Sequence, residues 1–138
     1  MDFSSDQHRS IYESVRRWVT GSYGEDANDP DRPMFSLRAG ETLVRLSIWG
    51  FEDGKVWLSF VTWPIPGTVA SPGAAHRLLA ANHEHVFGAW DLDGDRDVKF
   101  RYVVSAHGLT EEGFLEICSR FLTEAERAAS ELNMLLLD

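Results

Sequence analysis

The sequence predicts an α+β domain of two layers, in which helices pack against one face of a five-stranded antiparallel sheet. Segments with alternating hydrophobic and polar residues are joined in pairs by short turns that contain glycine, at 52–54 and 93–95, as paired antiparallel strands are. Three other segments repeat their hydrophobic residues every three or four positions, as amphipathic helices do. The predicted order is α-β-β-β-α-β-β-α, and such an order is typical of this class.

The composition fits one domain that spans residues 1–138, with 43% hydrophobic residues to fill a core. Acidic residues outnumber basic ones by 22 to 13, which gives a net charge of −9. Nucleic acids and anionic membranes reward clustered positive charge, so we expect neither as a partner. The N-terminus lacks the apolar run of a signal peptide, and a single cysteine predicts no internal disulfide, so we expect a cytoplasmic protein.

The first helix is predicted to begin at Ser4 or Ser5 as the N-cap and to end by residues 21–24. Its apolar face is formed by residues at helical spacing, Ile11, Val15, Trp18 and Val19. The following segment, 25–33, holds four acidic residues and two prolines without periodicity. We expect a mobile, solvated loop there.

Three strands are predicted next, at 34–37, 43–51 and 55–63, and the last two form a hairpin with Gly54 in its turn. Alternation divides the hairpin into two faces. One face is aliphatic or aromatic and belongs under the helices: Val44, Leu46, Ile48, Val56, Leu58 and Phe60. The other mixes large aromatic with polar side chains and is the predicted outer face: Arg45, Ser47, Trp49, Phe51, Trp57, Ser59, Val61 and Trp63.

The second half begins with a helix that has Ser71 as N-cap and Pro72 at its first position. Two further strands are predicted at 86–92 and 98–104. Thr110, followed by two acidic residues, predicts the start of a long last helix. Its apolar stripe repeats every three or four residues: Phe114, Cys118, Phe121, Ala125, Ala128, Leu132 and Leu135.

Several motifs of this half resemble the second half of YbjN-family domains, whose fold is similar to that of class I type III secretion chaperones. The motifs are Leu78-Leu79 with Asn82, Phe87-Gly88-Ala89-Trp90, Leu92-Asp93, Val98 with Phe100-Arg101-Tyr102, and Gly108-Leu109-Thr110-Glu111-Glu112. The match is dense from about 78 to 114, and the first half matches in element order. The resemblance implies a small acidic homodimer that holds an extended segment of a client protein and carries no catalytic residues.

The candidate binding residues lie on the predicted outer face: Arg45, Trp49, Phe51, Trp57, Val61 and Trp63, with Arg101 on a neighbouring strand. Trp and Arg are enriched where proteins hold partners, and a large exposed apolar patch usually marks a contact. Strand alternation leaves two alternatives open. The first helix folds across this face and buries it, or the face is a contact with a second copy of the chain.

Other candidate sites have simpler explanations. The alternating acids Asp91, Asp93, Asp95 and Asp97 invite a calcium loop, but the sixth and twelfth positions hold Arg and Tyr instead of Gly and Glu, so we expect a hairpin turn. His76, His83 and His85 have weak ligand spacing for a metal. Cys118 lies on an apolar stripe, where a core residue is expected rather than a nucleophile. We therefore predict no catalytic residue, metal or cofactor.

The function predicted from the sequence is that of a non-catalytic, chaperone-like module that binds an unidentified client protein as a homodimer. The alternative is a regulatory or sensory domain that binds a small apolar ligand in a pocket lined by Trp18, Trp49 or Trp90. A third possibility is an enzyme that uses the histidines at 76–85.

Overall fold

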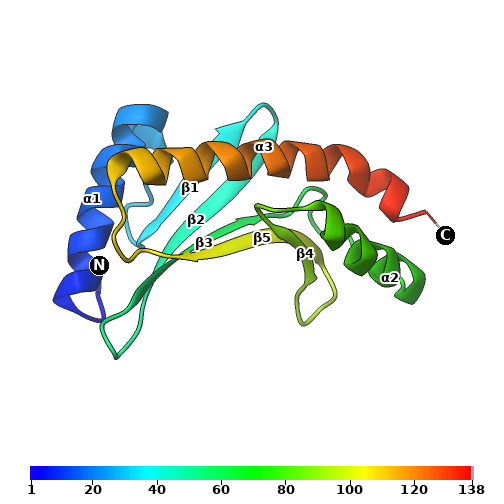
Figure 1. Ribbon diagram of the computed structural model, residues 1–138, viewed down its shortest axis with the longest axis horizontal. Coiled ribbons are helices and arrows are strands. Elements are labelled where there is room, and N and C mark those ends of the chain that lie inside the picture. Colours follow the sequence, from blue (N-terminus) through cyan, green and yellow to red (C-terminus); the bar gives the residue numbers. More distant parts are fainter. Residues whose placement is uncertain (138) are drawn as a thin grey trace.

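A computed structural model describes residues 1–137 and contains the predicted order of helices and strands (Figure 1). Two short 3₁₀ helices, η1 and η2, add to it. The elements are α1 (Asp6–Tyr23), η1 (Glu25–Ala27), β1 (Met34–Ala39), β2 (Thr42–Gly50), β3 (Val56–Thr62), α2 (Pro72–Ala81), η2 (Asn82–Glu84), β4 (Ala89–Leu92), β5 (Val98–Ser105) and α3 (Glu111–Leu135).

The five strands form one sheet in the order β1-β2-β3-β5-β4, and all neighbouring strands are antiparallel. Helix α3 crosses one face of this sheet from end to end, while α1 and α2 lie at its opposite ends (Figure 1). In residues 1–137 no helix lies across the other face (Figure 1). The predicted two-layer α+β architecture is confirmed.

Helix α3 forms for the reasons that its sequence indicates. The Thr110 hydroxyl accepts a hydrogen bond from the backbone N–H of Gly113 at 3.1 Å, and two acidic residues occupy the first turn. Ser5 and Ser71 cap α1 and α2 in the same way. Along α3, the buried residues recur every three or four positions, so one side of a 25-residue helix faces the sheet.

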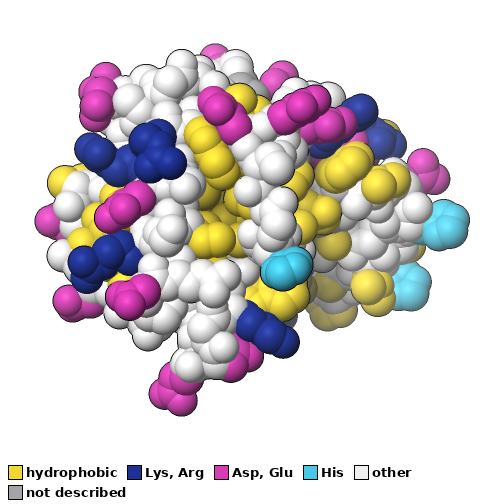
Figure 2. Space-filling model, turned by 60° about the vertical axis from the view of Figure 1, so that its left-hand side comes forward, with side chains coloured by type: hydrophobic (Ala, Val, Ile, Leu, Met, Phe, Trp, Pro, Cys, Tyr) yellow, Lys and Arg dark blue, Asp and Glu magenta, His cyan; other side chains and the backbone are white. Residues whose placement is uncertain are grey.

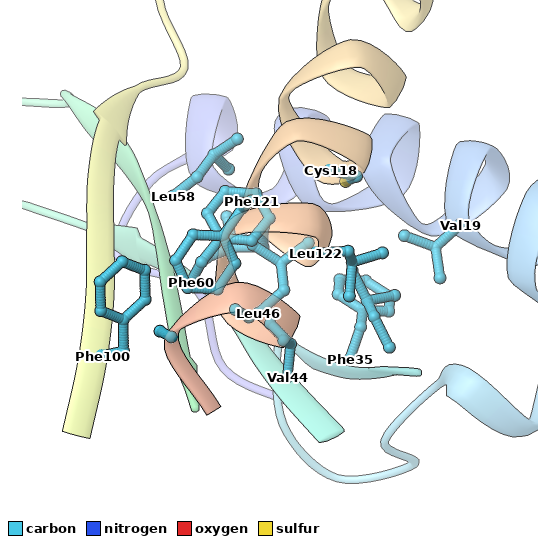
Figure 3. Packing of buried hydrophobic residues seen from close by; sticks show 14 of the residues in the cluster. Val19, Phe35, Val44, Leu46, Leu58, Phe60, Phe100, Cys118, Phe121 and Leu122 are labelled. Atoms are coloured by element: carbon cyan, nitrogen blue, oxygen red, sulfur yellow. The ribbon is translucent and has the colours of Figure 1, made fainter. Parts of the chain in front are cut away.

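The core lies between α3 and the sheet and is rich in phenylalanine (Figure 3). The ring of Phe121 on α3 lies 5.4 Å from the ring of Phe60 on β3 and 5.8 Å from that of Phe100 on β5. Such ring pairs contribute about 0.5–1.5 kcal/mol beyond the area they bury. Cys118 is also in this core, and burial raises the pKa of its thiol to about 12. Cys118 is therefore a core residue, as its position on the apolar stripe of α3 predicts.

Two segments differ from the sequence predictions. In the expected loop 25–33, residues Glu25–Ala27 form η1, Ala27 is buried, and Asn28 makes a β-bridge to Phe35. The strand predicted from residue 86 begins only at Ala89. The reason is Gly88, whose φ of 145° interrupts an extended strand and brings its backbone against the ring of Phe100.

No helix within residues 1–137 is long and apolar enough to cross a membrane.

Candidate protein-binding face

Alternate residues of β2, β3 and β5, continued by the residue that follows β2 and the one that follows β3, place a group of aromatic and cationic side chains on the face of the sheet that faces away from α3. We call this group the outer face: Arg45, Trp49, Phe51, Trp57, Val61, Trp63 and Arg101, which are the seven residues predicted from the sequence. Trp49 and Trp57 are directly opposite each other on β2 and β3, and 56% and 36% of their surfaces are exposed. Val61 lies between Arg45 and Arg101 across three strands. The predicted residues are therefore neighbours in space.

Two shallow hollows lie side by side on the outer face. One encloses about 400 Å³ and the other about 530 Å³, and both are bordered by Trp49, Val61 and Trp63. Ser59 belongs to the lining of both, and Ser47, its neighbour on β2, belongs to that of the larger. Small side chains at the centre and large rings at the ends produce a surface that is concave, a shape that suits the side chains of a partner.

Helix α1 does not cover the outer face. The ring of Tyr12 on α1 stacks on the ring of Phe35 in the core, with 5.8 Å between the ring centres, and Val15 and Val19 of the same helix are fully buried. The buried His8 fixes the start of the helix to β2, because its Nε2 lies 2.9 Å from the carbonyl oxygen of Ile48. Its Nδ1 accepts from the backbone N–H of Ser4 at 3.2 Å, so Nε2 carries the proton and donates. The alternative in which the first helix buries the aromatic side chains is wrong.

The charges of the outer face are positive. The guanidinium of Arg45 lies over the ring of Trp63, 5.4 Å from its centre, a cation–π contact. Arg101 and Lys99 share one carboxylate, that of Asp91, at 3.4 and 3.7 Å. Two cations thus meet one anion at the β5 side, and Arg45 has no ion-pair partner among residues 1–137.

The edge strand β4 is closed to strand addition by side chains. The Asn82 side chain accepts a hydrogen bond from the backbone N–H of Trp90 at 2.6 Å and donates one to its carbonyl at 3.2 Å. The carboxylate of Asp91 accepts from the backbone N–H of Leu92 at 2.8 Å. The amide of Asn82 therefore occupies the place of a neighbouring strand, a protection that edge strands need. Asn82 of the sequence motif thus has a role at the sheet edge.

A family model named YbjN and described as "Putative bacterial sensory transduction regulator" matches residues 13–134. The chain belongs to the YbjN family. The match covers both halves of the chain, whereas the resemblance in the sequence was dense only from about 78 to 114. In the comparison with curated proteins, none matches this YbjN-family chain.

Two solved structures share the fold. A chain in the crystal structure of the ExsC–ExsE complex is 19% identical, with a TM-score of 0.67 over 96% of this chain and 97% of that one. The Yersinia pestis type III secretion chaperone SycH, solved with a stable fragment of YscM2, is 10% identical, with a TM-score of 0.52 over 87% of this chain and 98% of that one. The predicted likeness to the type III secretion chaperone fold is confirmed.

Sequence reasoning missed part of the outer face of this YbjN-family protein. Lys99 and Val103 on β5 also line the smaller hollow. The signal was present, because residues 99, 101 and 103 alternate with the buried side of that strand. Ser59 was placed correctly on this face, but its relative exposure of 7% shows that it forms the floor rather than the rim.

The histidines at 76–85 do not converge. His76 and His83 are exposed, whereas the side chain of His85 is fully buried against α3. Its Nδ1 lies 2.8 Å from a carboxylate oxygen of Glu124 and its Nε2 lies 2.7 Å from one of Glu131. Both ring nitrogens are occupied by different carboxylates, so His85 fixes the segment before β4 to α3.

The acidic hairpin between β4 and β5 is held by its own backbone contacts. The carboxylate of Asp93 accepts hydrogen bonds from the backbone N–H groups of Asp95 and Asp97, at 2.9 and 3.0 Å. Arg96 adopts a positive φ of 63° at the end of this turn. The hairpin-turn interpretation of these aspartates is confirmed.

A second group of exposed apolar residues lies at the end of the molecule where α2 meets the last turns of α3 (Figure 1). We call it the α2 end, and it comprises Leu79, Val86, Met134 and Leu137. Leu79 and Val86 are 69% and 79% exposed. Arg77 ties the two helices together, since its Nε donates to the carbonyl of Leu135 at 2.9 Å.

The small-ligand alternative named Trp18, Trp49 or Trp90 as the lining of a pocket, and Trp49 borders the two hollows of the outer face. Trp18 packs on Phe114 at 5.5 Å on the helix side of the sheet, and Trp90 is buried against Phe100 at 5.2 Å. Trp49 lies on the outer face. The hollows that Trp49 borders are therefore where the small-ligand alternative would place its ligand.

Proposed function

We propose that this protein is a non-catalytic, chaperone-like binding module, and that it holds a segment of a partner protein on the outer face. One observation carries the proposal. The sheet buries its aliphatic side under α3, yet it presents Trp49, Trp57 and Trp63 around two hollows on the side that no helix of residues 1–137 covers. An apolar patch of this kind on a folded domain usually marks a contact.

The comparisons support this proposal through the fold. One structural neighbour belongs to the ExsC–ExsE complex, and the other is described as a type III secretion chaperone bound to a fragment of YscM2. Both were therefore solved with another polypeptide. Because this fold binds a polypeptide in both neighbours, we favour polypeptide binding for this protein as well. We place this activity in the cytoplasm.

Burial of side chains supplies the affinity in this proposal, rather than strand addition at β4. That edge is closed by Asn82 and Asp91. A partner that covers Trp49 and Trp57 removes two large rings from water, and apolar burial contributes about 25 cal/mol for each Å². Tryptophans in such positions commonly account for much of the binding free energy.

The same proposal includes a homodimer that forms through the α2 end. Leu79 and Val86 are the most exposed aliphatic side chains between α2 and β4, so they are available for a contact. Pairing of two copies through the outer face is less favourable, because the row of Arg45, Val61 and Arg101 would lie against cations of the second copy. In this proposal the α2 end binds a second copy of the chain and the outer face binds the partner protein.

The proposal is tested by capture from a native lysate with the wild-type protein, Trp57→Ala and Arg17→Gln as bait, and identification of the bound proteins. Arg17 is exposed on α1, away from the outer face. We expect one or more proteins that bind the wild type and Arg17→Gln and are lost with Trp57→Ala, while circular dichroism shows all three baits folded. Recovery of no protein other than the bait itself would count against the proposal.

Light scattering after size exclusion tests the homodimer. We expect the mass of two chains for the wild type and of one chain for Leu79→Glu combined with Val86→Glu. A monomeric wild type at all concentrations, or a dimer that the two substitutions leave intact, would contradict the assignment.

A second candidate function is favoured by the family description, which names a sensory transduction regulator. In that case a small apolar ligand occupies the 530 Å³ hollow of the outer face and changes how the protein meets its partner. Native mass spectrometry of the protein purified from its source tests this candidate, because a bound ligand adds a defined mass.

A further inference from the structure

The outer face is a cationic surface on an acidic protein. The five strands contain four cationic residues and one acidic residue, whereas the whole chain has a net charge of −9. All five charged residues lie on the outer side, because they alternate with buried neighbours: Arg38, Arg45, Lys99, Arg101 and Asp91. The charge of the whole protein is therefore a poor guide to the partner that this face prefers.

The cations stand close to the apolar contacts. Arg45 and Arg101 are two strands apart on either side of Val61, a separation of about 10 Å between backbones. Arg45 lies over Trp63, and Arg101 borders the same hollow as Trp57. A partner that places apolar side chains in the hollows thus brings its adjacent residues within reach of guanidinium groups, which bind carboxylates in a bidentate manner.

From this arrangement we propose that the segment held on the outer face is an acidic one, in which Asp or Glu residues adjoin large apolar residues. The inference rests on the proposed function and specifies the partner of that same site. Asp91 neutralises only part of the positive charge, since it serves both Lys99 and Arg101. A carboxylate from the partner can replace it at one of them and can meet Arg45, which has no ion-pair partner among residues 1–137.

Acidic loops around the sheet favour a short segment over a long polyanion. The turn between β1 and β2 carries Glu41, the turn between β2 and β3 carries Glu52 and Asp53, and the turn between β4 and β5 carries Asp93 and Asp95. Acidic side chains also stand around the outline of the molecule in Figure 2. A nucleic acid strand or a membrane extends beyond the sheet and meets these carboxylates, whereas a peptide segment ends before them.

The test measures binding of three synthetic peptides to the full chain by titration calorimetry. The acidic peptide has repeats of Glu-Glu-Leu-Phe, so that both sides of an extended chain carry an acid and an apolar residue; the controls have Gln or Lys in place of Glu. A length of about ten residues spans about 33 Å when extended, enough to cross the outer face. Oligothymidylate and phosphatidylcholine vesicles with phosphatidylglycerol serve as polyanionic probes.

We expect the acidic peptide to bind most tightly and the lysine peptide most weakly. Arg45→Gln and Arg101→Gln should each weaken binding of the acidic peptide about two- to fivefold more than they weaken binding of the glutamine peptide, the size of a partly exposed ion pair. Arg17→Gln, which removes an exposed cation of α1, should change neither. Raising the salt concentration from about 50 to about 500 mM should weaken the binding of the acidic peptide only.

Equal affinity for the three peptides, or tighter binding of the oligonucleotide or of the vesicles, would overturn the inference. The proposed function would survive equal affinity if Trp57→Ala weakened all three peptides together. If Trp57→Ala changed none of them, the outer face would not be the binding site and the proposed function would fail as well.

Discussion

The two faces of the sheet are built from the same strands and behave in opposite ways. On the inner face of β3, Leu58 and Phe60 are fully buried against helices. On the outer face of the same strand, Trp57 keeps more than a third of its surface exposed, and the small Ser59 leaves a hollow. Size and hydrophobicity alone therefore do not decide burial here. A tryptophan that the fold leaves uncovered is available for another molecule.

The difference between the two faces is tested most strongly by truncating two adjacent side chains of β3, one on each face. Leu58→Ala removes a fully buried side chain and should lower the free energy of unfolding by about 2–5 kcal/mol. Trp57→Ala removes a larger side chain one position away, yet it should cost about 1 kcal/mol or less, because Trp57 is 36% exposed and lies outside the buried core. Urea denaturation of both variants gives the two values. A larger loss for Trp57→Ala would show that its ring belongs to the core.

Gly88 tests how closely the inner face is packed. A Cβ at this position would lie 2.3 Å from Cε1 of Phe100, and the backbone has a φ of 145°. We expect Gly88→Ala to destabilise the fold by about 2–3 kcal/mol through the clash and the backbone strain. Gly21, whose added Cβ meets nothing within 4 Å, provides the matched control. Thermal melts that are equal for Gly88→Ala and Gly21→Ala would contradict the packing described for Phe100.

Asn82 tests the protection of the sheet edge. Asn82→Ala removes both hydrogen bonds to the backbone of Trp90 and should cost about 1–2 kcal/mol. It also uncovers an edge strand, so we expect concentration-dependent aggregation. Asn133, exposed on α3, is the control, and Asn133→Ala should change stability by about 0.5 kcal/mol or less. Light scattering that stays at the wild-type level for Asn82→Ala would show that the edge is protected by something else.

Cys118 gives the inner face a dependence on pH. Burial raises its thiol pKa from 9.0 to about 12, so above the lower value the unfolded chain loses a proton that the folded chain keeps. Stability should therefore fall as the pH rises, by about 1.4 kcal/mol between neutral pH and about pH 10. The raised pKa values of Tyr12 and Tyr23, caused mainly by burial, act in the same direction at higher pH. In Cys118→Ala the loss of folding stability that begins near pH 9 should disappear. If that loss persists in the variant, a group other than Cys118 causes it.

Local patterns in the sequence predicted the fold well where neighbouring residues decide the structure. The cap at Thr110, the stripe of α3 and the two faces of the hairpin follow from capping and from alternation. The start of β4 was placed too early, because Val86 and Phe87 continue the apolar pattern while Gly88 ends the extended backbone.

The interactions that sequence reasoning missed join residues far apart in the chain. His85 meets carboxylates 39 and 46 positions away on α3, and no spacing rule connects them. The position of α1 was equally open, because its apolar face fits either side of a sheet. Its place is decided by contacts such as those of His8 with β2 and of Tyr12 with Phe35. The outer face could be listed from alternation, but its exposure could not.

The most direct test of the outer face is hydroxyl-radical footprinting with mass spectrometry, on the free protein and on its complex with a partner captured from the native lysate. We predict that oxidation of Trp49 and Trp57 falls strongly in the complex, while that of Met134 at the α2 end changes with dimerisation rather than with the partner. Unchanged oxidation of Trp49 and Trp57 in a saturated complex would contradict this prediction.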